Sequence, residues 1–347
     1  MIASRNRPNR SAVMLDQPRP AIAAGAIRAE LPDGSTLTPA LPRRNSLRRP
    51  ATVRRDRINW PYATGVVLIH LLACLAFLPW FFSWSGVAAV FVGNYLFCSL
   101  GIGAGYHRCL AHRAFGCPKW FEHTLTILGV CTLQDSPARW VAIHRAHHRH
   151  PDRDTDPHSP LAGFLWGHIG WLFAVNSQFE QVPSYEKYVR DLFRDPFHKA
   201  LVRNEFWFFV YAAHALAILL IAFLVGWFWG GTASAGAQFG ASLLVWGVFV
   251  RTVYSWHVTW GTNSAAHFWG YRNYETGENS RNNWLIALTS NGDGWHNNHH
   301  ADPRCAAHGF HRWWELDVTY LTILIWERIG LVWKVRRSSK KLEPAAV

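Results

Sequence analysis

The sequence predicts an all-α integral membrane protein, in which four transmembrane helices form two hairpins beneath a helical cap. The first observation is a set of four apolar runs, each near the roughly 20 residues that a helix needs to cross a bilayer. They cover residues 62–84, 86–104, 206–229 and 235–254. The second is composition, since 50% of the 347 residues are hydrophobic and 20 are Trp, which is enriched at membrane interfaces. The third is a formal net charge of +13, carried by segments outside the runs.

The four runs pair into hairpins because short links join them. Residues 83–85 link the first pair, and a Gly- and Ala-rich turn at 230–236 links the second. With four crossings, both chain ends and the long segments 105–205 and 255–335 lie on one side of the membrane. Since these segments are basic, the positive-inside rule places them in the cytoplasm. We therefore expect a cytosolic cap and cytosolic termini, in the inner membrane if the protein is bacterial.

Composition also predicts the domain organisation. Residues 1–58 are rich in Arg and Pro, which is typical of a disordered basic tail. We expect a membrane domain over 59–335 and a flexible C-terminal tail over 336–347. Nucleic-acid binding is the alternative explanation of the positive charge, but basic loops are ordinary in membrane proteins, so we expect no nucleic-acid partner. The six Cys form no CxxC pair, which indicates reduced thiols.

Histidine is the residue type that carries the chemistry. The chain has 19 His, and nine of them fall in short motifs: His107 and His112; His144, His147 and His148; His267, four residues after Asn263; and His296, His299 and His300. Positions i, i+3 and i+4 share one face of a helix, so each HxxHH triplet projects together. The two adjacent histidines of each triplet point in directions that differ by about 100° around the helix axis, so they can reach two different metals. The i, i+5 pair does not share a face on an ideal helix, so we expect the chain to bend or unwind there.

These nine imidazoles, without Cys or carboxylate among them, predict two metal ions with room left for oxygen. A structural zinc site needs only four ligands and usually includes Cys, whereas imidazole also suits iron. We therefore interpret the motifs as a diiron centre. Ligating imidazoles need an acceptor on the second ring nitrogen, and four nearby carboxylates are candidates: Asp152, Asp154, Asp156 and Asp293. We interpret the remaining histidines as ordinary surface or core residues: His70, His123, His150, His158, His168, His198, His214, His257, His308 and His311.

Six segments resemble the membrane fatty-acid desaturases of the Δ9 acyl group, which includes stearoyl-CoA-type and acyl-lipid enzymes. They are GAGYHRCLAHRAF, WVAIHRAHHRHPDRDTDPHSP, GHIGW, NSAAHFWG, SRNNW and GDGWHNNHH, and they extend over about residues 60–320. The resemblance implies that the nine histidines ligate two irons and that Asn263 reaches one iron through water. It also implies a kinked acyl tunnel below the metals.

The implied reaction is an O₂-dependent insertion of a cis double bond, at Δ9, into a long saturated acyl chain carried by CoA or by a membrane lipid. The sequence contains no His-Pro-Gly-Gly haem motif, so we expect the two electrons to come from a separate ferredoxin-, rubredoxin- or cytochrome b5-type carrier. A basic cap would attract an acidic carrier. Tyr95 and Ser99, one turn apart, are candidates for the closed end of the tunnel, with ordinary helix packing as the alternative. Trp140 is a further candidate for the tunnel wall.

Two positions depart from the family pattern. Animal acyl-CoA members carry Arg-Asp before the first HxxHH motif, where they contact CoA, but this chain has Ala142 and Ile143. A lipid carrier, or CoA held by Arg139 and Arg145, would account for the change. Asp293 stands where Glu is usual, which keeps the charge.

Two other functions are compatible with a histidine-rich membrane protein. A membrane diiron fatty-acyl or alkane hydroxylase would use the same metal, because oxygen rebound after hydrogen abstraction gives an alcohol. A metal transporter or sensor would place ionisable residues inside the spans, and the runs hold few. Sphingolipid, carotenoid, ketoacyl and aldehyde substrates remain open.

Overall fold

The computed structural model describes residues 29–30, 36–37, 46–338 and 340 of the chain. The chain divides into two units, residues 1–39 and 40–347. In the first unit, β1 (Ala29–Glu30) pairs antiparallel with β2 (Thr36–Leu37). The second unit contains everything described below.

The second unit is built mostly of helices. Its α-helices are α1 (Trp60–Ala73), α2 (Trp84–Gly93), α3 (Lys119–Val130), α4 (Pro137–Arg149), α5 (Trp171–Phe173), α6 (Val182–Tyr185), α7 (Pro196–Val202), α8 (Phe206–Gly230), α9 (Ala233–Leu244), α10 (Arg251–Ser264), α11 (Trp284–Thr289), α12 (His296–Ala301) and α13 (Val318–Arg328). The wider π-helices are η3 (Asn94–Ala111), η5 (Trp166–Gly170) and η9 (Val245–Val250). The tighter 3-10 helices are η1 (Cys74–Phe77), η2 (Pro79–Phe81), η4 (Pro160–Ala162), η6 (Glu186–Tyr188), η7 (Leu192–Arg194), η8 (Arg203–Glu205) and η10 (Ala265–His267).

Four helical stretches of the described residues are long and apolar enough to cross a membrane, as the sequence predicts. They are Trp60–Phe77, Trp84–Ala111, Pro196–Gly230 and Ala233–His267. The first is shorter than expected because Leu78, which precedes Pro79, is extended. The helical conformation is disfavoured at a residue that precedes proline. The second and fourth continue beyond residues 104 and 254, so His107 and His267 lie on the long helices themselves.

Local sequence explains where the long helices begin and end. The Ser83 hydroxyl accepts the Gly86 N–H at 2.9 Å and caps α2. Gly231 ends α8 with φ +67°, a conformation that costs glycine little. Inside the bundle, η3 and α3 approach closely, because a Cβ on Gly101 would lie 2.3 Å from the Gly129 nitrogen.

One short sheet lies beside the helices. β3 (Val53–Ile58) pairs antiparallel with β4 (Ala174–Asn176). β3 falls at the end of the range for which we expect a disordered tail, and most of the rest of that range lies outside the described residues. The sequence gives no alternating pattern here, since β3 carries four charged side chains that are exposed.

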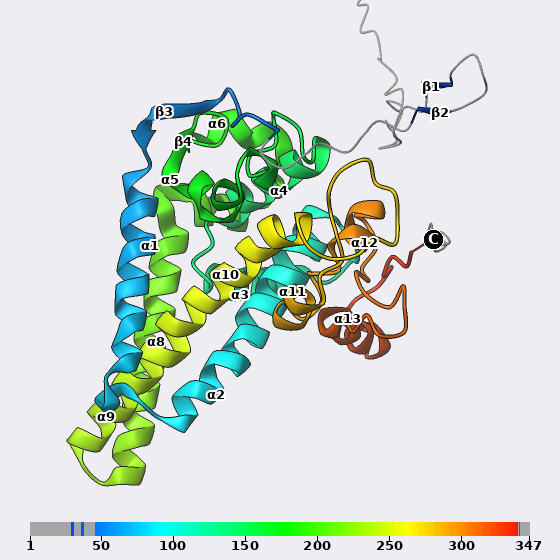
Figure 1. Cartoon of the computed structure of the whole chain (residues 1–347). Helices are drawn as coiled ribbons and strands as arrows, with labels where there is room; N and C mark the ends of the chain where they lie inside the picture. Colours follow the sequence, from blue (N-terminus) through cyan, green and yellow to red (C-terminus); the bar gives the residue numbers. More distant parts are fainter. Residues whose placement is uncertain (1–28, 31–35, 38–45, 339, 341–347) are drawn as a thin grey trace, which may run out of the picture. The chain divides into compact units, whose positions relative to one another are not determined.

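The long helices and the shorter elements occupy different parts of the unit. In Figure 1, α1 and α8 run from the side of the β3–β4 sheet to α9, and α10 leads back towards α12. α8 packs along α9, while α3 and α4 pack against η3. The motif histidines therefore lie where the long helices meet the shorter ones.

Candidate metal centre

α4 carries the first HxxHH triplet. The helix begins cleanly because the Ser136 hydroxyl accepts the Arg139 N–H at 3.3 Å and Pro137 occupies its first turn. His144 and His148 share one side of α4, and their ring centroids lie 4.5 Å apart. The ring planes of the adjacent His147 and His148 are turned by 77° to each other.

α12 carries the second triplet, and asparagines on its other face anchor it. The Asn298 side-chain oxygen accepts the Nδ2–H groups of Asn273 and Asn282, each at 2.8 Å. Its own Nδ2 donates to Glu315 Oε2 at 2.9 Å and to the His308 carbonyl at 2.8 Å. These buried bonds fix a helix of only six residues, so that its histidines face the centre.

His107 and His112 are brought together by the π-helical form of η3. The His112 N–H donates to the His107 carbonyl, five residues earlier, at 3.1 Å. The wider turn places residues i and i+5 on nearly the same face, and the two ring centroids lie 5.0 Å apart. Our expectation that the chain bends or unwinds between them is therefore wrong; a widened helix achieves the same juxtaposition.

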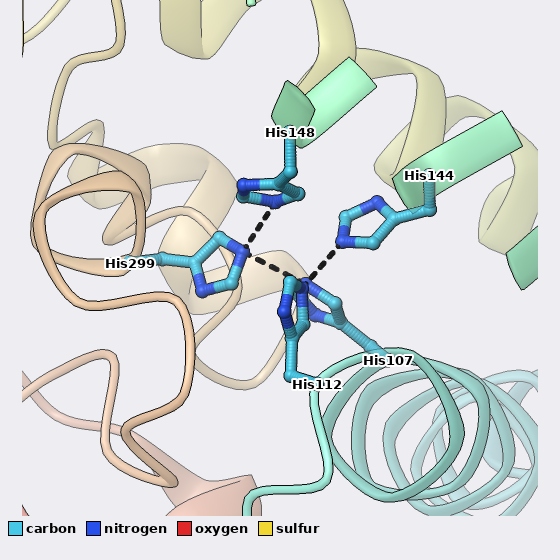
Figure 2. A group of neighbouring side chains, drawn as sticks. All are labelled: His107, His112, His144, His148 and His299. Atoms are coloured by element: carbon cyan, nitrogen blue, oxygen red, sulfur yellow. Dashed lines mark hydrogen bonds between the residues drawn. The ribbon is translucent and has the colours of Figure 1, made fainter. Parts of the chain in front are cut away.

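The nine motif histidines fall into two groups, in each of which the ligand atoms lie within 4.8 Å of one another. The first comprises His107, His112, His144, His148 and His299, and Figure 2 shows their rings converging from η3, α4 and α12. Its Nε2 atoms crowd together: His299 lies 3.0 Å from His107 and 2.9 Å from His148, and His112 lies 2.7 Å from His144.

The second group comprises His147, His267, His296 and His300. The Nε2 atoms of His147 and His300 lie 3.3 Å apart, and those of His267 and His296 lie 3.1 Å apart. The two groups adjoin, because each adjacent pair of an HxxHH motif contributes one ring to each. His299 and His300 have rings turned by 89°.

Buried carboxylates orient several of these rings through Nδ1. His147 Nδ1 lies 2.8 Å from Asp156 Oδ2, and His267 Nδ1 lies 3.0 Å from Asp152 Oδ2. Asp293 Oδ1 lies 3.7 Å from His107 Nδ1. Three of the four carboxylates that the sequence indicated are thus in place, whereas Asp154 is exposed.

The sequence analysis missed two residues at the centre. His308, which we interpreted as an ordinary residue, is fully buried, with Nδ1 3.1 Å from Asp293 Oδ1 and its ring centroid 4.4 Å from that of His299. Glu278 lies 3.7 Å from His300 Nδ1 and 3.8 Å from His267 Nδ1. Neither belongs to a helical repeat, so no periodic signal marked them.

The electrostatics favour the neutral form of six motif histidines and the ionised form of Asp156. Burial, reinforced by neighbouring histidines, lowers the pKa values of six motif histidines well below the ordinary value; they are His112, His144, His148, His296, His299 and His300. Burial alone would raise the pKa of Asp156, but its hydrogen bond and electrostatic interaction with His147 lower it. Neutral Nε2 atoms that face one another at hydrogen-bond distance, with their lone pairs inward, are the donor set that a transition metal takes. The residues therefore fit two metal ions.

A mostly apolar pocket adjoins the first group. His144, Asn263 and Trp140 line it, together with Trp256 and Trp260. Asn263, expected to reach a metal through water, thus shares a pocket with a motif histidine.

The other two predicted tunnel residues have different contacts. The Tyr95 hydroxyl lies 2.9 Å from Thr322 Oγ1, and the Ser99 hydroxyl lies 2.6 Å from Thr319 Oγ1. Among the described residues that line the pocket neither appears. Their contacts tie η3 to α13, which corresponds to the alternative of helix packing.

Four long apolar helices and two adjoining histidine groups beside an apolar pocket define a membrane protein with a candidate two-metal centre. A model of the fatty acid desaturase family matches residues 82–321 of the chain. The chain belongs to this family, and it is an oxidoreductase that acts on fatty acyl chains.

Individual relatives cover most of the chain. It is 39% identical over 291 residues to an sn-1 stearoyl-lipid 9-desaturase of Anabaena variabilis, which is 84% of this chain and 98% of the relative. It is 40% identical over 280 residues to an sn-2 palmitoyl-lipid 9-desaturase of Nostoc sp. (strain 36), covering 80% of this chain and 90% of the relative. An acyl-CoA C20 Delta5-desaturase of Anemone leveillei is 38% identical over 273 residues, covering 78% of this chain and 80% of the relative.

Proposed function

We propose that the chain inserts a cis double bond, at Δ9, into a long saturated acyl chain carried by a membrane lipid, with O₂ as co-substrate. The observation that carries the proposal is the convergence of nine imidazoles into two adjoining groups beside an apolar pocket. The relatives from Anabaena and Nostoc, both named lipid 9-desaturases, support the position and the carrier.

The proposed cofactor is a pair of non-haem irons, one at each histidine group, with Asn263 reaching an iron through water. The chemistry supplied by such a pair is the activation of O₂ for hydrogen abstraction from an unactivated methylene. The chain's own part is to orient the imidazoles: Asp156 and Asp152 accept from the Nδ1 atoms of His147 and His267, which turns each Nε2 atom towards the metal position.

The pocket positions the substrate. A mid-chain methylene has no polar group for the protein to bind, so burial along the chain must place it, at about 0.8 kcal/mol per CH₂. The pocket's Trp side chains, such as Trp140, exclude water and hold the reacting carbons near His144. Tyr95 and Ser99 stay our proposal for the closed end of a tunnel that extends beyond the pocket lining, where their bonds to α13 would block passage.

The surroundings of α4 favour a lipid carrier over CoA. Ala142 and Ile143 are buried, with exposed fractions of 0% and 6%, so they offer no polar contact to CoA. Arg139 is bonded to Asp135 and donates to the Phe179 carbonyl at 2.8 Å. Arg145 donates to the Ala111 and Leu110 carbonyls at 3.0 and 2.7 Å. Both arginines that we considered as replacements for the missing CoA contacts are therefore already bonded within the protein.

We further propose the membrane arrangement that the charge pattern predicts. The four long helices form two hairpins within a membrane domain at 59–335, flanked by flexible tails, and the cap, the centre and both termini face the cytoplasm. Two electrons arrive from a separate ferredoxin-, rubredoxin- or cytochrome b5-type carrier, guided by the net positive charge.

The test is expression in a host that lacks its own desaturase, followed by mass spectrometry of each lipid class. We expect loss of two hydrogens from acyl chains within intact membrane lipids, and no unsaturated product when His147 or His299 is replaced by Ala. Gain of an oxygen atom would identify a hydroxylase instead. Unsaturation that appears first in acyl-CoA would refute the lipid carrier.

A further inference from the structure

A second cluster of metal-binding side chains lies outside the nine-histidine centre, where α3 meets α7. Glu122 and His123 lie near the start of α3, Asp195 is the residue before α7, and His198 lies within α7. One ligand atom from each of the four lies within 4.8 Å of the others. The cluster thus brings two imidazoles and two carboxylates together from two helices.

The donor atoms of this cluster are aimed at one another. Asp195 Oδ1 caps α7 by accepting the Phe197 N–H at 3.0 Å, which leaves Oδ2 to face His123 Nε2 at 2.9 Å. The Phe197 ring stacks on His123 at 4.0 Å and fixes its orientation. His198 is buried, and its Nε2 lies 3.3 Å from Glu122 Oε1. Each imidazole therefore faces a carboxylate oxygen.

A lysine ammonium already occupies the position of a cation between the two carboxylates. Lys119 Nζ lies 2.7 Å from Glu122 Oε1 and 3.3 Å from Asp195 Oδ2. The Lys119 side chain is 63% exposed, so it can move into water, while the buried Glu122 keeps His198 as a partner. Arg113 Nη1 lies 3.6 Å from the other Glu122 oxygen and stays beside the cluster.

We propose that Glu122, His123, Asp195 and His198 form a second metal site, which takes Zn²⁺ in place of the Lys119 ammonium. Tetrahedral zinc with bonds near 2.0 Å separates its ligands by about 3.3 Å. Two ligand pairs already lie at 2.9 and 3.3 Å, so small side-chain rotations complete the site. Four protein ligands leave no open position, as in structural zinc sites, with carboxylates here in place of the usual Cys.

The position of the site gives it a stabilising role. α3 packs against η3, which carries His107, and α7 leads into α8. Zinc at this place ties the cap to two of the long helices. Bound zinc therefore raises the melting temperature and leaves the iron content unchanged.

The test uses the full chain, purified in detergent and loaded with iron, then titrated with Zn²⁺. Zinc and iron are counted by elemental analysis, and the melting temperature is followed. We expect one more zinc per chain in the wild type than in the double variant His123→Gln, Asp195→Asn, and a zinc-dependent rise in melting temperature that this variant lacks. Lys119→Ala removes the competing ammonium and tightens zinc binding. His150→Gln, at an exposed histidine, is the matched control and behaves as the wild type.

Three results would overturn the assignment. They are equal zinc content and equal thermal shift in the wild type and the double variant, unchanged or weaker zinc binding in Lys119→Ala, and loss of iron as zinc enters. Loss of zinc in Cys117→Ser would also overturn it, because Cys109, Cys117 and Glu122 form a neighbouring group. Desaturation measured on the same samples separates this proposal from the proposed function, since either can fail while the other holds.

Discussion

Replacing Asp156 by Asn perturbs one histidine group and leaves the other untouched. Asp156 Oδ2 accepts from His147 Nδ1 at 2.8 Å and from the Asp152 N–H at 2.9 Å, and Oδ1 accepts the His158 N–H at 3.1 Å. All three partners are donors, so the amide nitrogen of Asn must face one of them. An unpaired buried donor costs about 1–3 kcal/mol, and loss of an outer acceptor weakens metal binding by about 10- to 100-fold.

The assay is iron retention by the purified protein against a graded chelator, with the melting temperature measured in parallel. We expect Asp156→Asn to release the iron of the His147 group first, so that iron falls from two towards one per chain, and desaturation falls with it. Asp154→Asn is the matched control, because Asp154 is exposed two residues away. An Asp156→Asn protein with wild-type chelator resistance and wild-type activity would refute the orienting role of the carboxylate.

Three further outcomes are expected. Gly101→Ala lowers the melting temperature, because its Cβ would meet backbone at 2.3 Å and overpacking costs about 1–3 kcal/mol, whereas Gly65→Ala, with nothing within 4 Å, does not. His308→Gln lowers iron affinity less than loss of a motif histidine, since His308 supports Asp293; iron counting after chelation distinguishes the two. Burial alone would raise the pKa of Asp191, but its arginine partners lower it. The ionised Asp191 therefore stabilises the folded protein fully above the pKa of the unfolded state, about 3.9, and this stabilisation is lost as the pH falls through the lower pKa of the folded state. The melting difference between wild type and Asp191→Asn should therefore shrink in acid; a constant difference counts against this ion pair.

The directions of the motif histidines could be predicted from sequence because helical periodicity determines them. His144, His147 and His148 lie on a regular α-helix, so their shared face follows from spacing alone. The distribution of the nine residues into groups of five and four could not be predicted, because it depends on how α4, α12 and η3 pack. The π-helical form of η3 could not be predicted either, since helix propensity does not distinguish a π-helix from an α-helix.

Site residues that lie in irregular segments could not be predicted from helical periodicity. Asp152 and Asp156 were found because they follow α4 closely, but Glu278 and His308 come from irregular segments. Tyr95 and Ser99 were placed correctly on one side of the second long helix, yet their partners on α13 are more than 200 residues away in sequence, with separations of 227 and 220. Only tertiary packing determines such pairs.

The carboxylates around the two histidine groups are distributed unequally, and this makes the groups chemically different. The four-histidine group faces three buried carboxylates, because Asp156 and Asp152 accept from two of its rings and Glu278 lies near two. The five-histidine group faces one carboxylate, Asp293, which Arg108 contacts at 2.9 Å while also pairing with Asp317 at 3.0 Å. Negative charge beside a ligating imidazole raises its basicity and favours the more highly charged metal ion. Two irons bound here would therefore be inequivalent. The iron at the four-histidine group would be held more strongly. The positive charge of the iron at the five-histidine group, which adjoins the pocket through His144, would be offset by fewer carboxylates.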